Sequence, residues 1–373
     1  MTLAVAALAA IVVACALCLV FWPSPIEPRV WAPAPDRGHS GRFARNDRLS
    51  NLRRIDLGGA VGPEHIAFGP DGKLYTGVVG GDILRVNPDG GERETFANTG
   101  GRVLGLAFDA AGRLIGADSY RGLVAVAPDR SVRLLADEVE GTPILFANAV
   151  VVAANGLIYF TDSSRRFPPK VWGGTMEACA PDVLEQSATG RLLVHDAKTG
   201  ETRLVAAGLS FANGVALSSD QSALFVAETG RYRIWRIPVA SRALDLSIGA
   251  NGGASVLFDN LPGFPDNLMR GLPGKDGRPR VWVGLTKPRN PIIDKMAGSP
   301  FLRKAALKLP DALKPIPKDH GHIFAFTDDG EVVADLQDPS GSFPETTAAT
   351  EFGDRLYVAS LTAKEIGWMP RPE

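Results

Sequence analysis

Apolar and polar residues alternate along most of this chain in a pattern that returns about every 40 residues. Each repeat contains an apolar strand, a polar turn, a strand of β-branched or aromatic residues, a turn with Gly and a third alternating strand. The segments GLAFDAAGRLIGADSYRGLVAVAPDR and GVALSSDQSALFVAETGRYRIWRIPV are examples. This period is typical of four-stranded blades, so the pattern predicts a β-propeller.

Six repeats of this kind predict six blades. Their first strands are expected to begin near Glu64, Leu104, Asn148, Asn213, Asp266 and Thr347. The two longest repeats predict insertions at residues 165–187 and 287–318. The sixth repeat holds about three strands before the chain ends, so residues 51–57 are expected to complete it and close the ring. We therefore expect an all-β, six-bladed propeller over residues 51–373.

The N-terminal segment differs from the rest of the chain. Residues 3–22 are an unbroken apolar run, about 30 Å long as a helix, which matches the hydrocarbon thickness of a bilayer. The run predicts a transmembrane helix as membrane anchor at residues 1–24 and a linker at residues 25–50. A cleaved signal peptide is the alternative, but no small-x-small site follows the run.

We expect a single-pass membrane protein whose propeller lies on the extracytoplasmic side. Several arginines follow the apolar run, and the positive-inside rule alone would keep that flank cytoplasmic. A large domain after the only span can override such charges. The net charge of −1 gives no general attraction to nucleic acid, so we expect no nucleic-acid partner. Cys179 is the only cysteine of the expected propeller, which excludes a disulfide within it, and it is expected to be a surface or lid residue rather than a nucleophile.

Four repeats open on residues that bind hard cations. These are Glu64 in GPEHIAF, Asn148 in FANAVVV, Asn213 in FANGVAL and Asp266 in FPDNLM. Calcium takes oxygen ligands of this kind, whereas zinc would favour His and Cys. Any one of the four could be an ordinary turn residue. Their recurrence at one blade position predicts a single calcium ion in the central channel.

The same segments resemble a known family. GPEHIAF, FANAVVVAANGLIYFTDSS, FANGVALSSD and LPGFPDN are similar to the strictosidine synthase-like and adipocyte plasma membrane-associated protein-like branch of the gluconolactonase (regucalcin) and paraoxonase propellers. The metal-binding Glu, Asn, Asn and Asp of that superfamily would fall on the four residues above. The resemblance implies calcium-dependent hydrolysis of small esters or lactones, with Asp266 as nucleophile or general base beside the metal.

Departures from the family pattern limit what the resemblance implies. Strictosidine synthases use a catalytic Glu in the last blade, and the matching position is Thr347, so we do not expect strictosidine synthesis. Glu345 and Glu351 lie nearby, but strand alternation does not direct either into the channel. Paraoxonases place a His where this chain has Leu104. A non-catalytic, membrane-anchored propeller that binds a ligand or protein therefore stays open as the alternative.

Some residues outside the quartet also carry expectations. Residues 290–318 mix apolar and basic residues and predict one or two amphipathic helices. We expect them to cover the channel and contact the membrane, and packing on the blade alone is the alternative. His39 lies in the linker, and His320 and His322 are expected at the surface, with an approach to the channel mouth as the alternative. Three acidic residues recur one strand further out and are expected to form loop hydrogen bonds that join neighbouring blades, rather than to act in catalysis: Asp118, Asp162 and Glu228.

Overall fold

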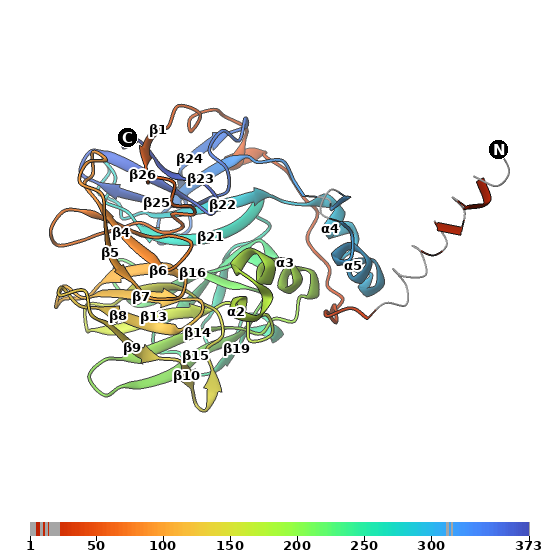
Figure 1. Ribbon diagram of the computed structural model, residues 1–373, viewed down its shortest axis with the longest axis horizontal. Helices are drawn as coiled ribbons and strands as arrows, with labels where there is room; N and C mark the ends of the chain where they lie inside the picture. The colour runs from red at the N-terminus through yellow and green to blue at the C-terminus, as the bar shows by residue number, and fades with distance from the viewer. Residues whose placement is uncertain are drawn as a thin grey trace.

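The computed structural model describes residues 5–7, 10–11, 14, 23–310, 313–314 and 316–372. Within this part of the chain, five four-stranded sheets and one five-stranded sheet form the blades of a propeller. Figure 1 shows the blades packed around a common centre, with the inserted helices gathered on one side. The expected six-bladed, mainly β propeller is confirmed.

The first three blades follow one another along the chain. Their strands are β2 (Ala67–Phe68), β3 (Leu74–Gly77), β4 (Asp82–Val86) and β5 (Glu94–Asn98) in blade one; β6 (Val103–Phe108), β7 (Leu114–Asp118), β8 (Gly122–Val126) and β9 (Val132–Ala136) in blade two; and β12 (Ala147–Val152), β13 (Leu157–Asp162), β14 (Gly190–Asp196), β15 (Glu201–Leu209) and the parallel β19 (Leu244–Asp245) in blade three. A small hairpin of β10 (Glu138–Val139) and β11 (Thr142–Pro143) separates blades two and three.

The last three blades include the closure of the ring. Their strands are β16 (Ala212–Leu217), β17 (Ala223–Glu228), β18 (Arg233–Pro238) and β20 (Ser255–Phe258) in blade four; β21 (Gly263–Arg270), β22 (Val281–Pro288), β23 (Gly321–Phe326) and β24 (Val332–Asp338) in blade five; and β25 (Thr346–Phe352), β26 (Arg355–Ser360), β27 (Glu365–Pro370) and β1 (Arg53–Asp56) in blade six. The pairing of β1 with β27 confirms that residues 51–57 complete the sixth blade.

Both predicted insertions contain helices. Blade three carries α2 (Pro169–Trp172) and α3 (Thr175–Glu185), and blade five carries α4 (Pro291–Lys295) and α5 (Pro300–Leu307). The α4 and α5 helices each begin with Pro, and the residue before it caps the helix: Asn290 for α4 and Ser299 for α5. Each capping side chain accepts hydrogen bonds from backbone N–H groups of the first turn. Short 3-10 turns among the described residues are η1 (Gly41–Phe43), η2 (Thr229–Arg231) and η3 (Leu246–Ile248).

Apolar side chains from neighbouring blades form the core. Between blades three and four, Tyr159 and Leu192 pack with Val215 and Trp235, and Trp235 is fully buried. Burying a large apolar side chain contributes roughly 1.5–3 kcal/mol, so the ring is stabilised mainly by these contacts between blades. The alternation seen in the sequence is the origin of this arrangement, because one face of each strand meets the next blade.

The predicted linker packs against the propeller. Ile26 is fully buried in a cluster with Phe146 and Phe167, and the backbone N–H of Leu49 donates to the carbonyl oxygen of Gln337 at 2.9 Å. Most of the apolar run at residues 3–22, and with it the predicted anchor, lies outside the described residues. In the described part of the chain, no helix combines the length and apolar character needed to cross a membrane.

Candidate metal centre and pocket

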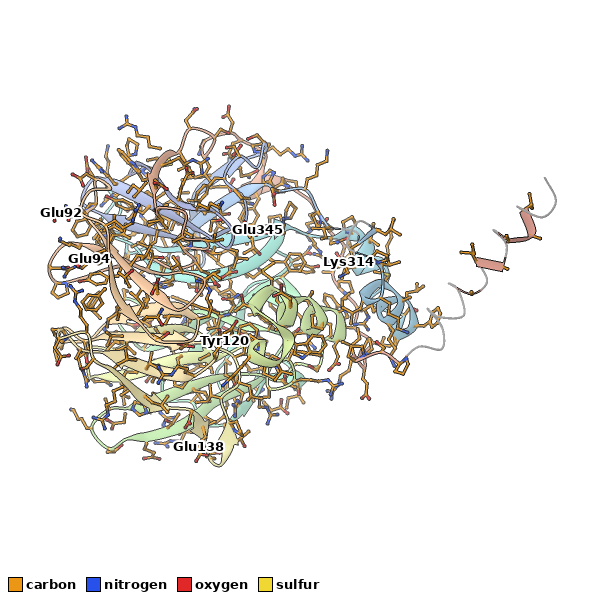
Figure 2. All side chains as sticks on the ribbon, in the orientation of Figure 1. Glu92, Glu94, Tyr120, Glu138, Lys314 and Glu345 are labelled. Carbon is orange, nitrogen blue, oxygen red and sulfur yellow. The ribbon has the colours of Figure 1, made fainter. Side chains whose placement is uncertain are left out.

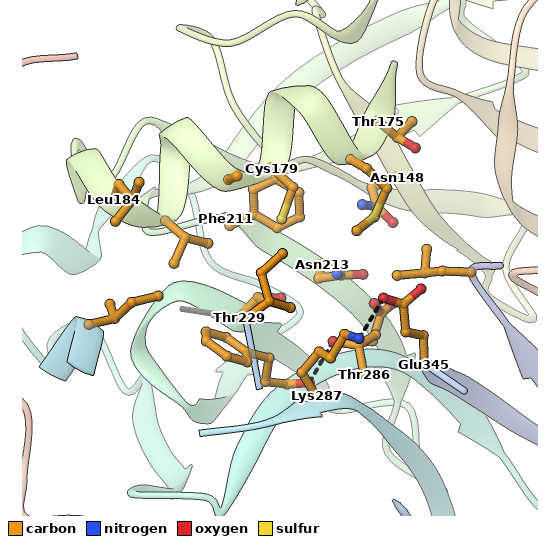
Figure 3. A pocket seen from close by; sticks show the side chains of 18 of the residues that line it. Asn148, Thr175, Cys179, Leu184, Phe211, Asn213, Thr229, Thr286, Lys287 and Glu345 are labelled. Atoms are coloured by element: carbon orange, nitrogen blue, oxygen red, sulfur yellow. Dashed lines mark hydrogen bonds and ion pairs between the residues drawn. The ribbon is translucent and has the colours of Figure 1, made fainter. Parts of the chain in front are cut away.

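A cavity of about 260 Å³ lies between the first strands of the blades and the inserted helices. All four residues predicted as calcium ligands line it: Glu64, Asn148, Asn213 and Asp266. Figure 3 shows Asn148 and Asn213 directed into this space, with Cys179 on the helix that covers it. The structure therefore brings together, from four blades, the residues that the repeat pattern singled out.

Irregular strands direct these side chains into the cavity. The pairing register shifts between Ala147 and Val150 in β12, between Ala212 and Val215 in β16, and between Pro265 and Leu268 in β21. Each shift spans one of the predicted ligands. A β-bulge of this kind breaks the alternation and re-aims a side chain. The bulges thus explain why Asn148, Asn213 and Asp266 leave the blade faces and converge on the channel.

Glycine permits the close approach of the strands at the site. A Cβ atom at Gly214, next to Asn213, would lie 2.4 Å from the backbone oxygen of Asp266 and 2.4 Å from the backbone nitrogen of Leu268. Both atoms belong to the neighbouring blade and cannot move independently of it. Gly214 is therefore needed to bring Asn213 and Asp266 side by side.

Three buried oxygens of the predicted ligands have no hydrogen-bond partner in the described part of the chain. They are Oδ1 of Asn148, Oδ1 of Asn213 and Oδ1 of Asp266, and each residue is at most 4% exposed. Leaving a buried polar group unsatisfied costs about 1–3 kcal/mol, so such groups call for a partner. Together with Glu64, these residues surround one space with oxygen donors, and Glu64 and Asp266 contribute ionisable carboxyl groups. Such a set fits a hard divalent cation such as calcium.

The electrostatics of the two carboxyl groups agree with this fit. Burial raises the pKa of Glu64 to about 7, against an opposing effect of Arg102. Burial, followed by the charge of Glu64, raises the pKa of Asp266 well above its usual range, although the Asn267 backbone N–H and the Asn213 side chain stabilise its charged form. Two neighbouring carboxylates oppose each other's ionisation, and a bound cation would favour both charged forms.

Polar contacts hold Glu64 in place. The Nη2 atom of Arg102 lies 3.3 Å from Oε2 of Glu64 and donates to the carbonyl oxygen of Gly62 at 2.8 Å. The carbonyl oxygen of Glu64 accepts from Oγ1 of Thr347 at 2.6 Å and from Nδ2 of Asn267 at 3.2 Å. Thr347 thus braces the backbone of a candidate ligand and is not among the residues that line the cavity.

Glu345 lies in a position that the sequence did not predict. It lines the cavity, is 7% exposed and lies 3.0 Å through Oε1 from Nζ of Lys287. Figures 2 and 3 show Glu345 on the side of the propeller that faces the inserted helices. The expectation that alternation keeps it out of the channel is wrong, because Glu345 has a left-handed backbone (φ 49°) and the register shifts between Thr346 and Ala349.

Lys287 was also missed, because nothing in its local sequence distinguishes it from other lysines. Its ammonium group pairs with Asp319 as well as Glu345. Burial lowers the pKa of Lys287, but hydrogen bonds to the two carboxylates outweigh this effect and raise it. Glu351 behaves as expected: its Oε2 accepts from the backbone N–H of Leu272 at 2.6 Å, and it does not line the cavity.

Most of the remaining wall is apolar. It includes Leu104, Phe146, Phe211 and Phe264 from the blades and Leu184 from α3. Cys179 of α3 also lines the cavity, and burial, followed by the charges of nearby acidic residues, raises the pKa of its thiol. A thiol that stays protonated is a poor nucleophile, in agreement with the expectation for Cys179.

The acidic residues one strand further out support the loops. Oδ1 of Asp162 accepts from the backbone N–H of Phe146 at 2.8 Å, and Oε1 of Glu228 accepts from that of Ser210 at 2.9 Å. Asp118 makes the corresponding bond with Arg102 at 3.0 Å. The expected loop hydrogen bonds are present, but each positions the chain that enters the first strand of the acid's own blade and does not join it to a neighbouring blade.

The class of protein follows from its fold. The chain is similar to a gluconolactonase from Xanthomonas campestris, with a TM-score of 0.60 at 18% identity, covering 94% of this chain and 99% of the other. It is also similar to regucalcin, a calcium-binding protein from Agrobacterium tumefaciens, with a TM-score of 0.55 at 17% identity over 83% and 85% of the two chains. Its fold is therefore that of the gluconolactonase and regucalcin propellers.

Sequence comparison identifies the family within this class. Residues 41–86 match the strictosidine synthase-like N-terminal region, and residues 148–240 match strictosidine synthase. The chain is 33% identical over 330 residues to strictosidine synthase-like protein 6 of Arabidopsis thaliana, covering 86% of this chain and 82% of the relative. It is 31% identical over 371 residues to the adipocyte plasma membrane-associated protein of Bos taurus, covering 92% and 84%. The chain belongs to the strictosidine synthase-like family.

Proposed function

We propose that this protein is a calcium-dependent hydrolase of neutral esters or lactones that works at a membrane surface. The observation that carries the proposal is the group of three unsatisfied buried oxygens on Asn148, Asn213 and Asp266, beside Glu64, at the base of an apolar cavity. A gluconolactonase and a calcium-binding regucalcin have folds similar to that of this chain. The first likeness supports lactone hydrolysis, and the second supports calcium binding.

Glu64, Asn148, Asn213 and Asp266 would hold the calcium ion. When bound, the ion would supply positive charge that polarises a substrate carbonyl group. As a nucleophile, the carboxylate of Asp266 would attack the carbonyl carbon and the C–O bond to the alcohol would break, leaving an acyl-aspartate that water then hydrolyses. As a general base, it would take a proton from a water molecule whose oxygen attacks the carbonyl carbon while the alcohol leaves. Asp266 suits either role because it borders the cavity and its Oδ1 is unsatisfied. Asn213 would orient this carboxylate through its side-chain amide.

The wall of the cavity favours a neutral and largely apolar substrate. Leu104, Phe146 and Phe211 offer no hydrogen-bonding side chain, and the charges of Lys287 and Glu345 in the cavity wall offset each other. A cavity of about 260 Å³ suits a small ester or lactone. Strictosidine synthesis is disfavoured because Thr347 is engaged with the Glu64 backbone and Glu345 is paired with Lys287.

A screen of aryl esters and lactones, with calcium and with a chelator, tests the proposal. Chelator-sensitive hydrolysis is expected, and Asp266→Asn should lose nearly all of it even at saturating calcium, because an amide can coordinate but cannot attack or accept a proton. Asp182→Asn is the matched control, since Asp182 is also a buried acid with a pKa raised by burial, to about 7, but does not line the cavity. Full activity in Asp266→Asn would refute the catalytic role.

The same screen separates the second candidate function. An apolar cavity beneath inserted helices would also suit a non-catalytic propeller that retains a ligand. Stoichiometric calcium binding without chelator-sensitive turnover of any ester or lactone in the screen would favour this binding function. An amine with an aldehyde substrate should give no condensation product.

The proposed membrane attachment involves the two insertions, which form the rim of the cavity. The exposed apolar side chains Val171, Met176, Phe301 and Leu302 lie on the two insertions, and Met176 also lines the cavity. The chain that follows the apolar run passes the same helices, because the backbone N–H of Arg29 donates to the carbonyl oxygen of Glu185 on α3 at 2.8 Å. An anchor at residues 3–22 would therefore hold this rim toward the lipid, and the adipocyte relative is named as plasma membrane-associated.

Hydrogen exchange of the full chain in lipid nanodiscs and in detergent tests this arrangement. The backbone of α5 should exchange more slowly in nanodiscs, whereas β4 and β5 in blade one should not change. Equal exchange of α5 in the two environments would show that the rim does not contact the membrane.

A further inference from the structure

We propose a second metal site, independent of the calcium site and of the proposed hydrolase function, in which His39, His320 and His322 bind a zinc-like transition-metal ion and fasten the N-terminal linker to blade five. One coordinating atom from each of the three side chains lies within 4.8 Å of the other two. His320 and His322 were expected at the surface but are only 7% and 2% exposed. Their burial beside a third histidine is what calls for an explanation.

The fold brings the three rings together from distant parts of the chain. His322 lies on β23 and His320 just before it, and residues two apart on an extended strand share one face. The linker then crosses this face and places the ring of His39 4.3 Å from that of His320 and 5.4 Å from that of His322, measured between centroids. Phe43, in the η1 turn, packs edge-on against His322. The cluster is therefore a junction between linker and blade.

Surrounding hydrogen bonds leave one nitrogen of each blade histidine available for a metal. Nε2 of His322 lies 2.6 Å from Oδ1 of Asp335, and Nε2 of His320 lies 3.2 Å from Oε1 of Gln337. Oδ2 of Asp335 accepts in turn from Asn46 at 2.8 Å and from Gln337 at 2.6 Å. With Nε2 as the donor, Nδ1 of each ring carries the lone pair. A carboxylate behind a metal-binding histidine is the usual outer-shell arrangement, because it orients the ring and strengthens its basicity.

The local charges suit a divalent cation with nitrogen ligands. Burial, followed by the neighbouring histidines, lowers the pKa of His39 to about 4, and burial lowers that of His320. Imidazole coordinates metals in its neutral form, and a lowered pKa favours that form. Asp335 supplies negative charge that offsets the nearby Arg45. Three imidazoles favour zinc, nickel, copper or cobalt over calcium, so this site and the oxygen quartet would select different ions.

A metal here would act on the neighbouring insertion as well as on the linker. His320 follows Asp319, whose carboxylate pairs with Lys287, and Lys287 pairs with Glu345 at the cavity. Residues 290–318, which carry α4 and α5, rejoin the blade at this point. Binding at the three histidines would thus hold both the linker and the C-terminal end of residues 290–318 against blade five.

The experiment uses the full chain in detergent, purified through a tag without histidine and freed of metal. Zinc uptake is measured by calorimetry, and cobalt is used as a spectroscopic probe because imidazole coordination gives visible absorption bands. We expect one zinc ion per chain in the presence of excess calcium. His39→Gln should weaken binding by at least about tenfold, by analogy with the loss typical of outer-shell changes.

Two controls keep the result interpretable. His195→Gln should bind zinc as the wild type does, since His195 is a buried histidine of blade three whose Nδ1 bonds to Thr202 at 2.9 Å. His39 is partly exposed in the linker, so its variant should fold even if a variant of the buried His322 does not. Zinc, but not calcium, should also slow tryptic cleavage at the exposed Arg42 and Arg45 of the linker. Absence of stoichiometric zinc or cobalt uptake, or uptake unchanged in His39→Gln, would overturn the proposal and leave the cluster as aromatic packing.

Discussion

Calcium binding at the quartet should release protons. Burial raises the pKa of Glu64 from 4.5 to about 7, so ionising this carboxyl group in the folded protein without a cation costs about 3 kcal/mol more than in water. The folded state then binds the proton more tightly than the unfolded state, and stability without calcium should fall as the pH rises from about 4.5 through about 7. Calcium requires the charged form, so its affinity should rise with pH.

The size of the effect follows from the same shift. At pH 6, a group with a pKa of about 7 is mostly protonated, and at pH 8 it is mostly charged. The dissociation constant for calcium should therefore fall about tenfold from pH 6 to pH 8 through Glu64 alone. Asp266, whose pKa is raised further by the same burial and by Glu64, should add to this change.

Calorimetric titration with calcium at pH 6, in two buffers of different ionisation enthalpy, measures the protons released. We expect between one and two protons per calcium ion. Glu64→Gln should lower this number by about one and weaken binding, because it removes one of the two charges. Asp182→Asn should leave the number unchanged, since this buried acid lies outside the cavity lining. A calcium affinity that is independent of pH between 6 and 8, with no proton release, would refute the assignment of Glu64 as a ligand.

Two further predictions concern the scaffold of the site. Gly214→Ala should destabilise the protein by about 1–3 kcal/mol and weaken calcium binding, because its Cβ would meet backbone atoms of the next blade at 2.4 Å. Denaturant unfolding measures the loss of stability, and Gly298→Ala is the control because the space around its Cβ is open. Equal stability of the two variants would show that the close approach at Gly214 does not require glycine. Arg303→Met should speed hydrogen exchange in α5 while the blades stay protected, because the buried guanidinium donates to the carbonyl oxygens of Leu184 and Ala297. Lys304→Met is the control. Unchanged exchange in Arg303→Met would show that these hydrogen bonds do not hold the helix in place.

The propeller could be predicted from the sequence because its information is local. Alternation along each strand and the spacing of turns are properties of neighbouring residues, and they indicated six blades, two insertions and closure by residues 51–57. The quartet was equally visible, since Glu64, Asn148, Asn213 and Asp266 stand at the same position in four repeats. Equivalent positions in a closed ring face one channel, so recurrence in the sequence became convergence in space.

Only the tertiary structure decided the features that depend on register or on contacts between distant segments. Glu345 enters the cavity because a bulge and a left-handed residue break the alternation that would have turned it away. His39 meets His320 and His322 because the linker folds back across blade five. Neither a bulge nor the path of a linker is encoded in a two-residue period, because both are set by the packing of whole blades against one another.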